Sequence, residues 1–148
     1  RVPSGFCGPT SLKMVLEYFG IKKPINFLGD ADVGGATPVY TSGQGAGHQA
    51  MLDMLRHCGL KGSYMTHAKF IDWLRQQTAA GKPVVVSVKG NFGGGYYTAG
   101  HILVVSGVTP DGRVILNDSV GGKRRIVSGS AFLGAWNSSN RMAIVAQQ

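Results

Sequence analysis

The sequence has little cysteine, little negative charge and no long apolar run. Cys7 and Cys58 are the only cysteines among 148 residues, so we expect neither a disulfide framework nor a CxxC metal motif. No apolar stretch approaches membrane-spanning length, and we therefore expect no integral membrane segment. Seven acidic residues stand against 15 lysines and arginines, and the resulting net charge of +8 favours an anionic partner surface.

The basic residues form no stripe that alternates with aromatic side chains. They are scattered along the chain apart from residues 123–125, which read Lys-Arg-Arg, so we expect no nucleic-acid partner. His48, His57 and His67 stand at spacings that suit no metal site, and we interpret them as surface or capping residues. The sequence predicts no metal and no cofactor.

The length is that of one domain, and we assign residues 1–148 to a single unit. Its helical part covers about residues 1–82 and its sheet part about residues 83–148. We see no signal peptide, and Cys7 follows only six residues, so we expect a processed form or a domain excised from a larger protein. We expect it to be a monomer.

Three segments of the first part repeat apolar residues with a helical period. A helix that has Cys7 at its N-terminus and ends at Gly20 is predicted by the spacing of Leu12, Val15, Leu16 and Phe19. Residues 48–58 predict a second helix with Cys58 on its apolar face, closed by Gly59, and residues 66–80 a third, closed by Gly81. The third would bury four apolar side chains, namely Phe70, Ile71, Trp73 and Leu74. Residues 26–47 read as a loop.

The second part has the pattern of strands. We predict strands at residues 84–88, 101–108, 113–118, 124–128 and 142–146, with a turn at Asp111 and Gly112 and a short helix over residues 130–136 that ends at Trp136. Trp136 belongs either to the core or to a cleft wall. Glycine-rich residues 90–100 favour a mobile flap or a long connection. The order predicts an α+β fold in which N-terminal helices pack on a C-terminal antiparallel sheet.

Cys7 has the placement of a nucleophile. A helix N-terminus stabilises a thiolate, because the unpaired N–H groups there carry partial positive charge. The same N–H groups, that of Cys7 included, can hold an oxyanion, and Gly8 allows close approach of a substrate.

A base and an orienting group follow from the predicted hairpin. His101 opens one strand, and a turn near residues 110–111 sets it opposite residues 117–119 of the next. Asn117 and Asp118 are therefore both available to orient the imidazole.

Three motifs together resemble a known family. They are Cys-Gly-Pro-Thr-Ser-Leu-Lys-Met-Val-Leu at residues 7–16, Gly-His-Ile-Leu-Val-Val-Ser-Gly-Val at 100–108 and Val-Ile-Leu-Asn-Asp-Ser at 114–119. They look like the C39-like cysteine peptidases of the papain clan, which include leader-cleaving domains of bacteriocin exporters and many secreted bacterial proteins. The resemblance implies a papain-like fold and a secreted or cell-envelope location.

The resemblance also implies the roles of the site residues. Cys7 would be the nucleophile, His101 the general base and acid, and Asp118 the orienting residue, with Asn117 as the alternative. The family has a Gln six residues before its Cys that helps to bind the oxyanion, and Arg1 stands there instead. Other donors that could take its place are Asn91 and Gln44.

We therefore expect a thiol peptidase that acts on a peptide or a peptide-containing polymer through a thioester. Candidate substrate contacts are Gly8, Tyr96, Tyr97 and Gly100. Three alternatives remain: a peptidoglycan amidase or endopeptidase of a toxin or lysin, a transferase on the same core, and a catalytically inactive peptide-binding module.

Overall fold

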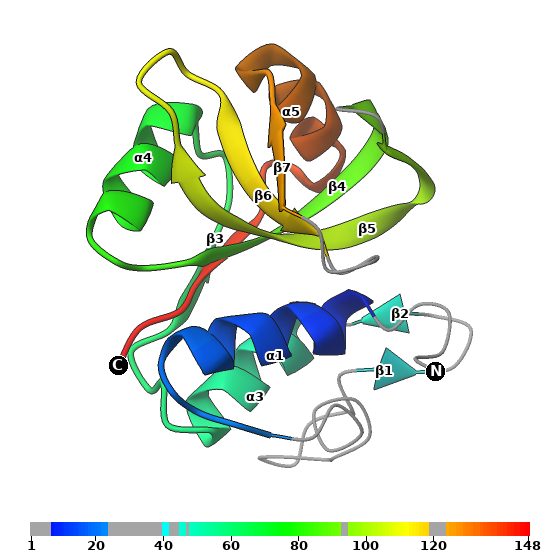
Figure 1. Ribbon diagram of the computed structural model, residues 1–148. Helices are drawn as coiled ribbons and strands as arrows, with labels where there is room; N and C mark the ends of the chain where they lie inside the picture. Colours follow the sequence, from blue (N-terminus) through cyan, green and yellow to red (C-terminus); the bar gives the residue numbers. More distant parts are fainter. Residues whose placement is uncertain (1–6, 24–39, 42–44, 47, 93–94, 119–123) are drawn as a thin grey trace.

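The chain folds into a sheet covered by helices on both faces (Figure 1). This computed structural model describes residues 7–23, 40–41, 45–46, 48–92, 95–118 and 124–148. Among them, side chains are described for residues 8–23, 48–90, 101–117 and 124–148. The arrangement confirms the predicted α+β class.

Four helices and eight strands occur within the described residues. The helices are α1 (Cys7–Tyr18), α3 (His48–His57), α4 (Ile71–Ala79) and α5 (Gly129–Trp136), with a 3-10 turn η1 (Asn137–Ser139). The strands are β1 (Tyr40–Thr41), β2 (Gly45–Ala46), β3 (Tyr64–Thr66), β4 (Val84–Phe92), β5 (Gly95–Val108), β6 (Val114–Asp118), β7 (Arg124–Val127) and β8 (Ala143–Val145). Within the described chain, no helix has the length and apolar character needed to cross a membrane.

The main sheet has six antiparallel strands in the order β3-β8-β4-β5-β6-β7. Strands β4 to β7 form the predicted meander, whereas β8 returns to lie between β3 and β4. Strand β4 therefore has a neighbour on each side as well as a covered face above and below. That position explains why it begins with three valines in succession.

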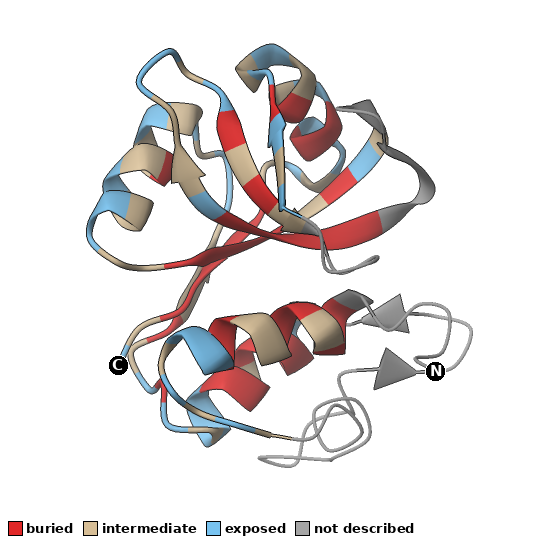
Figure 2. Cartoon of the chain, in the orientation of Figure 1, coloured by how far each residue is buried: buried red, intermediate tan, exposed pale blue. Residues whose placement is uncertain are grey.

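Alternate residues of the central strands enter two cores. Val85, Ile102 and Val104 pack in the core with α1 and α3, while Val86 and Leu103 pack in the core with α5 and α4. Figure 2 shows buried residues along the sheet and on helices that cover both of its faces. Successive side chains of a strand point to opposite faces of the sheet, so each central strand contributes side chains to both cores.

Trp136 belongs to the core. Its side chain is fully buried and packs against Phe132, and its indole N–H donates to the Met142 carbonyl at 2.7 Å. The alternative of a cleft wall is therefore wrong. Buried indoles need such a partner, because an unpaired N–H in the core costs free energy.

The sequence correctly predicted the start of the first helix and the glycines that end the first two helices. Helix α1 begins at Cys7, and Gly20 follows its end with φ of +77°. Gly59 follows α3 with φ of +110°. Both glycines take the left-handed backbone that ends helices at low cost.

The third predicted helix begins five residues too early. Helix α4 starts at Ile71, because the preceding residues form β3 and a bend in which the Ala68 N–H donates to the Asn140 carbonyl at 2.8 Å. Phe70, expected in the core, is 60% exposed and lies under the Arg141 guanidinium at 4.4 Å. Of the four apolar side chains expected in that core, only Leu74 is fully buried.

The glycine-rich stretch forms a β-hairpin, and its mobility stays a prediction. Strand β4 continues to Phe92 and β5 starts at Gly95, with Gly90 paired to Tyr97. A bulge beside Gly90, whose φ is +120°, admits the glycine without ending the strand. His101 consequently lies inside β5 instead of opening a strand.

Two further strand pairings were not predicted. Strands β1 and β2 pair with each other inside the segment expected to be a loop, at residues 26–47. Strand β3 pairs with β8 through Tyr64–Val145, Met65–Ile144 and Thr66–Ala143.

Gly20→Ala and Gly134→Ala test the role of glycine conformation as a matched pair, because a Cβ at either position meets nothing within 4 Å. The left-handed backbone at Gly20 should cost an alanine about 1 kcal/mol of unfolding free energy. Gly134 lies inside α5, where alanine should add about 0.5–1 kcal/mol. Urea unfolding followed by circular dichroism measures both, and effects of the same sign would contradict this reasoning.

Candidate active site

Helix α1 presents its N-terminus at Cys7. The helix is anchored by Leu12, Val15 and Leu16, which are at most 1% exposed in the core beneath the sheet. Gly8 and Pro9 in its first turn are also buried. A helix end held in this way keeps its unpaired N–H groups in a fixed direction.

Ser11 links this helix to the strand that contains His101. Its hydroxyl donates to the Ile102 carbonyl at 3.3 Å, and the bond is buried. Ser11 follows Cys7 by four residues, so both lie on the same face of α1. Ile102 is next to His101, which is only 7% exposed. Sequence analysis missed this role of Ser11, for which the four-residue spacing from Cys7 was the available signal.

The register between β5 and β6 differs from the prediction. Asp118 pairs with Leu103, and Asn117 pairs with Val104. His101 lies two residues before Leu103, so position 118 is its diagonal neighbour rather than its direct partner. The difference begins at the turn, which is centred on Asp111 because the Thr109 N–H donates to the Arg113 carbonyl at 2.8 Å and Val108 pairs with Val114. A bulge at Ser106, between Val105 and Gly107, then moves the pairing one residue back toward the predicted register.

Several predicted site residues lie outside the described side chains. The backbone is described at Cys7 and Asp118 but their side chains are not. The same holds for Asn91, Tyr96, Tyr97 and Gly100, whereas Arg1 and Gln44 lie outside the described residues altogether. Their roles stay predictions.

The second cysteine has a different environment from a helix N-terminus. Cys58 is half-buried, and its thiol donates to the Met54 sulfur at 3.8 Å. Burial raises the pKa of this thiol, although the Lys23 charge opposes the shift. Cys58 is therefore held as a thiol at neutral pH.

The histidines other than His101 form no metal centre in the described part of the chain, where no cluster of three suitable ligands occurs. His48 is the first residue of α3. Burial lowers its pKa, and the charge of His67 lowers that pKa further. His48 is therefore neutral at physiological pH.

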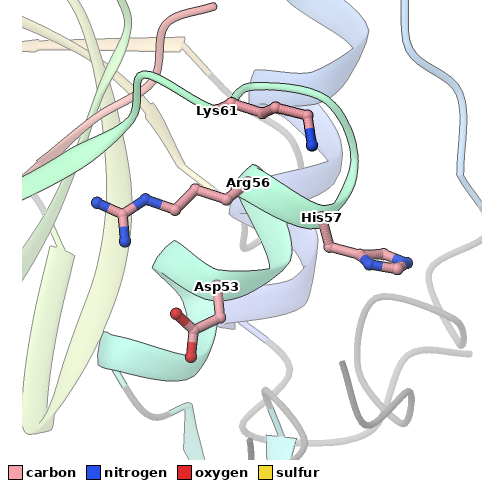
Figure 3. Close-up of a pocket in the computed structure, with 4 residues that line it drawn as sticks. All are labelled: Asp53, Arg56, His57 and Lys61. Carbon is pink, nitrogen blue, oxygen red and sulfur yellow. The ribbon is translucent and has the colours of Figure 1, made fainter. Parts of the chain in front are cut away.

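A shallow hollow at the end of α3 has the wrong geometry for a site. It is lined by Asp53, Arg56, His57 and Lys61, and the side chains of Arg56 and His57 point in opposite directions (Figure 3). The Arg56 Nε donates to the Ser63 carbonyl at 3.0 Å. These groups do not converge on a common ligand.

The structure thus places a helix that begins with a cysteine beneath the strand of an antiparallel sheet that contains His101. The chain belongs to the Peptidase_C39 like family, whose model matches residues 2–144. It is also similar to the crystal structure of a candidate C39-like peptidase from Bacillus anthracis, with a TM-score of 0.72 and 21% identity over 98% of this chain and 90% of that one. No curated protein sequence matches the chain.

Iodoacetamide should alkylate Cys7 at least about tenfold faster than Cys58 below pH 7, because only the thiolate reacts. The helix N-terminus favours the thiolate at Cys7, whereas burial disfavours it at Cys58. A time course of labelling, read by peptide mass mapping, measures both rates in one sample. Cys58→Ser should leave the Cys7 rate unchanged, and equally slow labelling of the two thiols would refute an activated Cys7.

Proposed function

We propose that this chain is a cysteine peptidase that hydrolyses a peptide bond through a thioester intermediate. The hydrogen bond between Ser11 and Ile102 carries the proposal, because it joins the first turns of α1 to the part of β5 that contains His101. A thiol at a helix N-terminus beside an imidazole forms a nucleophile and base pair. Membership of a peptidase-like family also supports the assignment as a peptidase.

In the proposed reaction, His101 takes the thiol proton and the Cys7 sulfur attacks the carbonyl carbon of the scissile bond. The resulting oxyanion accepts hydrogen bonds from N–H groups at the start of α1, including that of Cys7. His101 then protonates the leaving amine as the thioester forms. Water, deprotonated by His101, attacks the thioester, releases the carboxylic acid and restores the thiol.

The strand register favours Asp118 over Asn117 as the group that orients His101. Residues two apart on a strand share a face, and directly paired residues do too, so positions 101, 103 and 118 belong to one face. Asn117 pairs with Val104, which packs in the opposite core. Position 117 is therefore on the wrong side of the sheet.

Helix α1 and position 101 lie on opposite faces of β5. Helix α1 covers the face of Ile102 and Val104, whereas position 101 shares the face of Leu103. In the proposed reaction the imidazole would therefore reach the N-terminus of α1 around β5 rather than from the face that α1 covers.

Cys7→Ala and His101→Ala should each lower turnover at least about 10³-fold while the fold is retained, since each removes a reacting group. Activity is measured by mass spectrometry of products from a glycine-rich peptide panel, whole proteins and purified peptidoglycan. Circular dichroism and urea unfolding control for the fold. Wild-type activity in either variant would exclude that residue from the mechanism.

The net charge of +8 favours a second candidate, an amidase or endopeptidase that acts on the peptides of an anionic wall polymer. The same assay separates the candidates. Products from peptidoglycan alone would identify the wall enzyme. Acyl transfer to an added amine would identify a transferase, and binding without products would identify an inactive module.

Asp118→Ala should lower kcat about 10²-fold to 10⁴-fold, because an imidazole without its orienting partner adopts the wrong tautomer. Asn117→Ala should change kcat less than about threefold, since position 117 is on the opposite face. Steady-state kinetics of the two variants measures the difference. The reverse order of effects would assign the third role to Asn117.

A further inference from the structure

Strand β7 ends the sheet next to the candidate site. It pairs with β6 on one side, and it has no second neighbour among the described strands. An edge strand directs alternate N–H and C=O groups outward, where an extended peptide can add as another strand.

One face of β7 is buried and the other is not. Val127 is 3% exposed and packs with Val114 and Leu116 in the core under α5. On the opposite face Ile126 is 46% exposed, and Arg124 is exposed as well. Ile126 thus offers an apolar side chain beside an open strand edge, and Arg124 offers a positive charge two residues away on the same face.

The exposed face continues across neighbouring strands as two rows. One row is Gly107, Ile115 and Ile126, in which the Ile115 side chain lies 3.2 Å from the position that a Cβ on Gly107 would occupy. Glycine at 107 thus lets Ile115 lie flat across β5. The result is a smooth aliphatic platform beside the edge.

The second row contains one basic residue and passes close to the candidate site. It consists of Val104, Asn117 and Arg124, and only Val104 is covered by the core around α1. Arg124 takes part in no ion pair within the described residues. Asn117 is followed by Asp118, so this row lies one residue from the candidate orienting group.

We propose that the edge and exposed face of β7 bind an extended acidic segment of the peptide substrate. Arg124 would pair with a carboxylate, and Ile126 would pack on an aliphatic side chain two residues away along the same peptide face. This inference rests on the proposed function, because it names a feature of the substrate of that site.

Fluorescein-labelled peptides test the proposal through binding. The probe peptide has threonine at every second position, and the positions between are filled by glutamate and valine in turn. The control peptide has lysine in place of each glutamate. Arg124→Glu should weaken binding of the acidic peptide about fivefold and favour the lysine peptide, as reversal of one surface charge allows. Ile126→Ser should weaken both peptides. Fluorescence anisotropy measures each Kd.

Lys61→Glu is the matched control, because it makes the same charge change at an exposed residue beyond α3. Equal effects of Lys61→Glu and Arg124→Glu on Kd would overturn the docking edge. Aggregation of the Arg124→Glu variant with an unchanged Kd would also overturn it. Arg124 would then serve only to keep the edge of β7 from pairing with other chains.

Kinetics separate this inference from the proposed function. Arg124→Glu should raise KM for an acidic substrate about fivefold, with kcat and the Cys7 alkylation rate unchanged. Turnover with an unchanged KM would overturn the docking edge and leave the peptidase standing. Charge-dependent binding without any turnover would refute the peptidase and leave the docking edge standing.

Discussion

One buried hydrogen bond joins parts of the chain that are 91 residues apart, from the Ser11 hydroxyl in α1 to the Ile102 carbonyl in β5. The apolar side chains around it exclude water, which strengthens the bond and raises the cost of breaking it. If α1 slid along the sheet, the buried hydroxyl would lose its partner at a cost of about 1–3 kcal/mol. The position of Cys7 relative to His101 depends on this contact, and every chemical proposal for the site depends on that position.

The sequence predicted elements whose signals are local. Helices α1, α3 and α5 have an apolar period that matches their packing, and Gly20 and Gly59 mark the ends of the first two. Strand β3 was missed because it has three residues and pairs, among the described strands, with β8 alone, which follows much later in the chain. The glycines near residue 90 signalled a turn, but cross-strand pairing with residues 95–97 outweighed that preference.

The candidate site was predictable in part for the same reason. Cys7 before a helical pattern and His101 in an apolar run are readable along the chain, and the structure brings α1 to the segment that contains His101. The alignment with Asp118 was two residues off, because the turn is centred on Asp111, where the Thr109 N–H bonds to the Arg113 carbonyl, and the bulge at Ser106 recovers only one residue of the offset. Ser11 was overlooked because a serine inside a helix has no special local meaning until its distant partner is known.

The place of β8 has a consequence for biosynthesis. Its residues, Ala143–Val145, come late in the sequence but lie inside the sheet, where they separate β3 from β4. Until the ribosome has made them, β3 lacks its strand partner and β4 has one open side. A nascent chain therefore exposes apolar edges that invite aggregation, and it also lacks a closed sheet to support the helix with Cys7. The sheet that supports α1 can therefore close only after residues 143–145 have been synthesised.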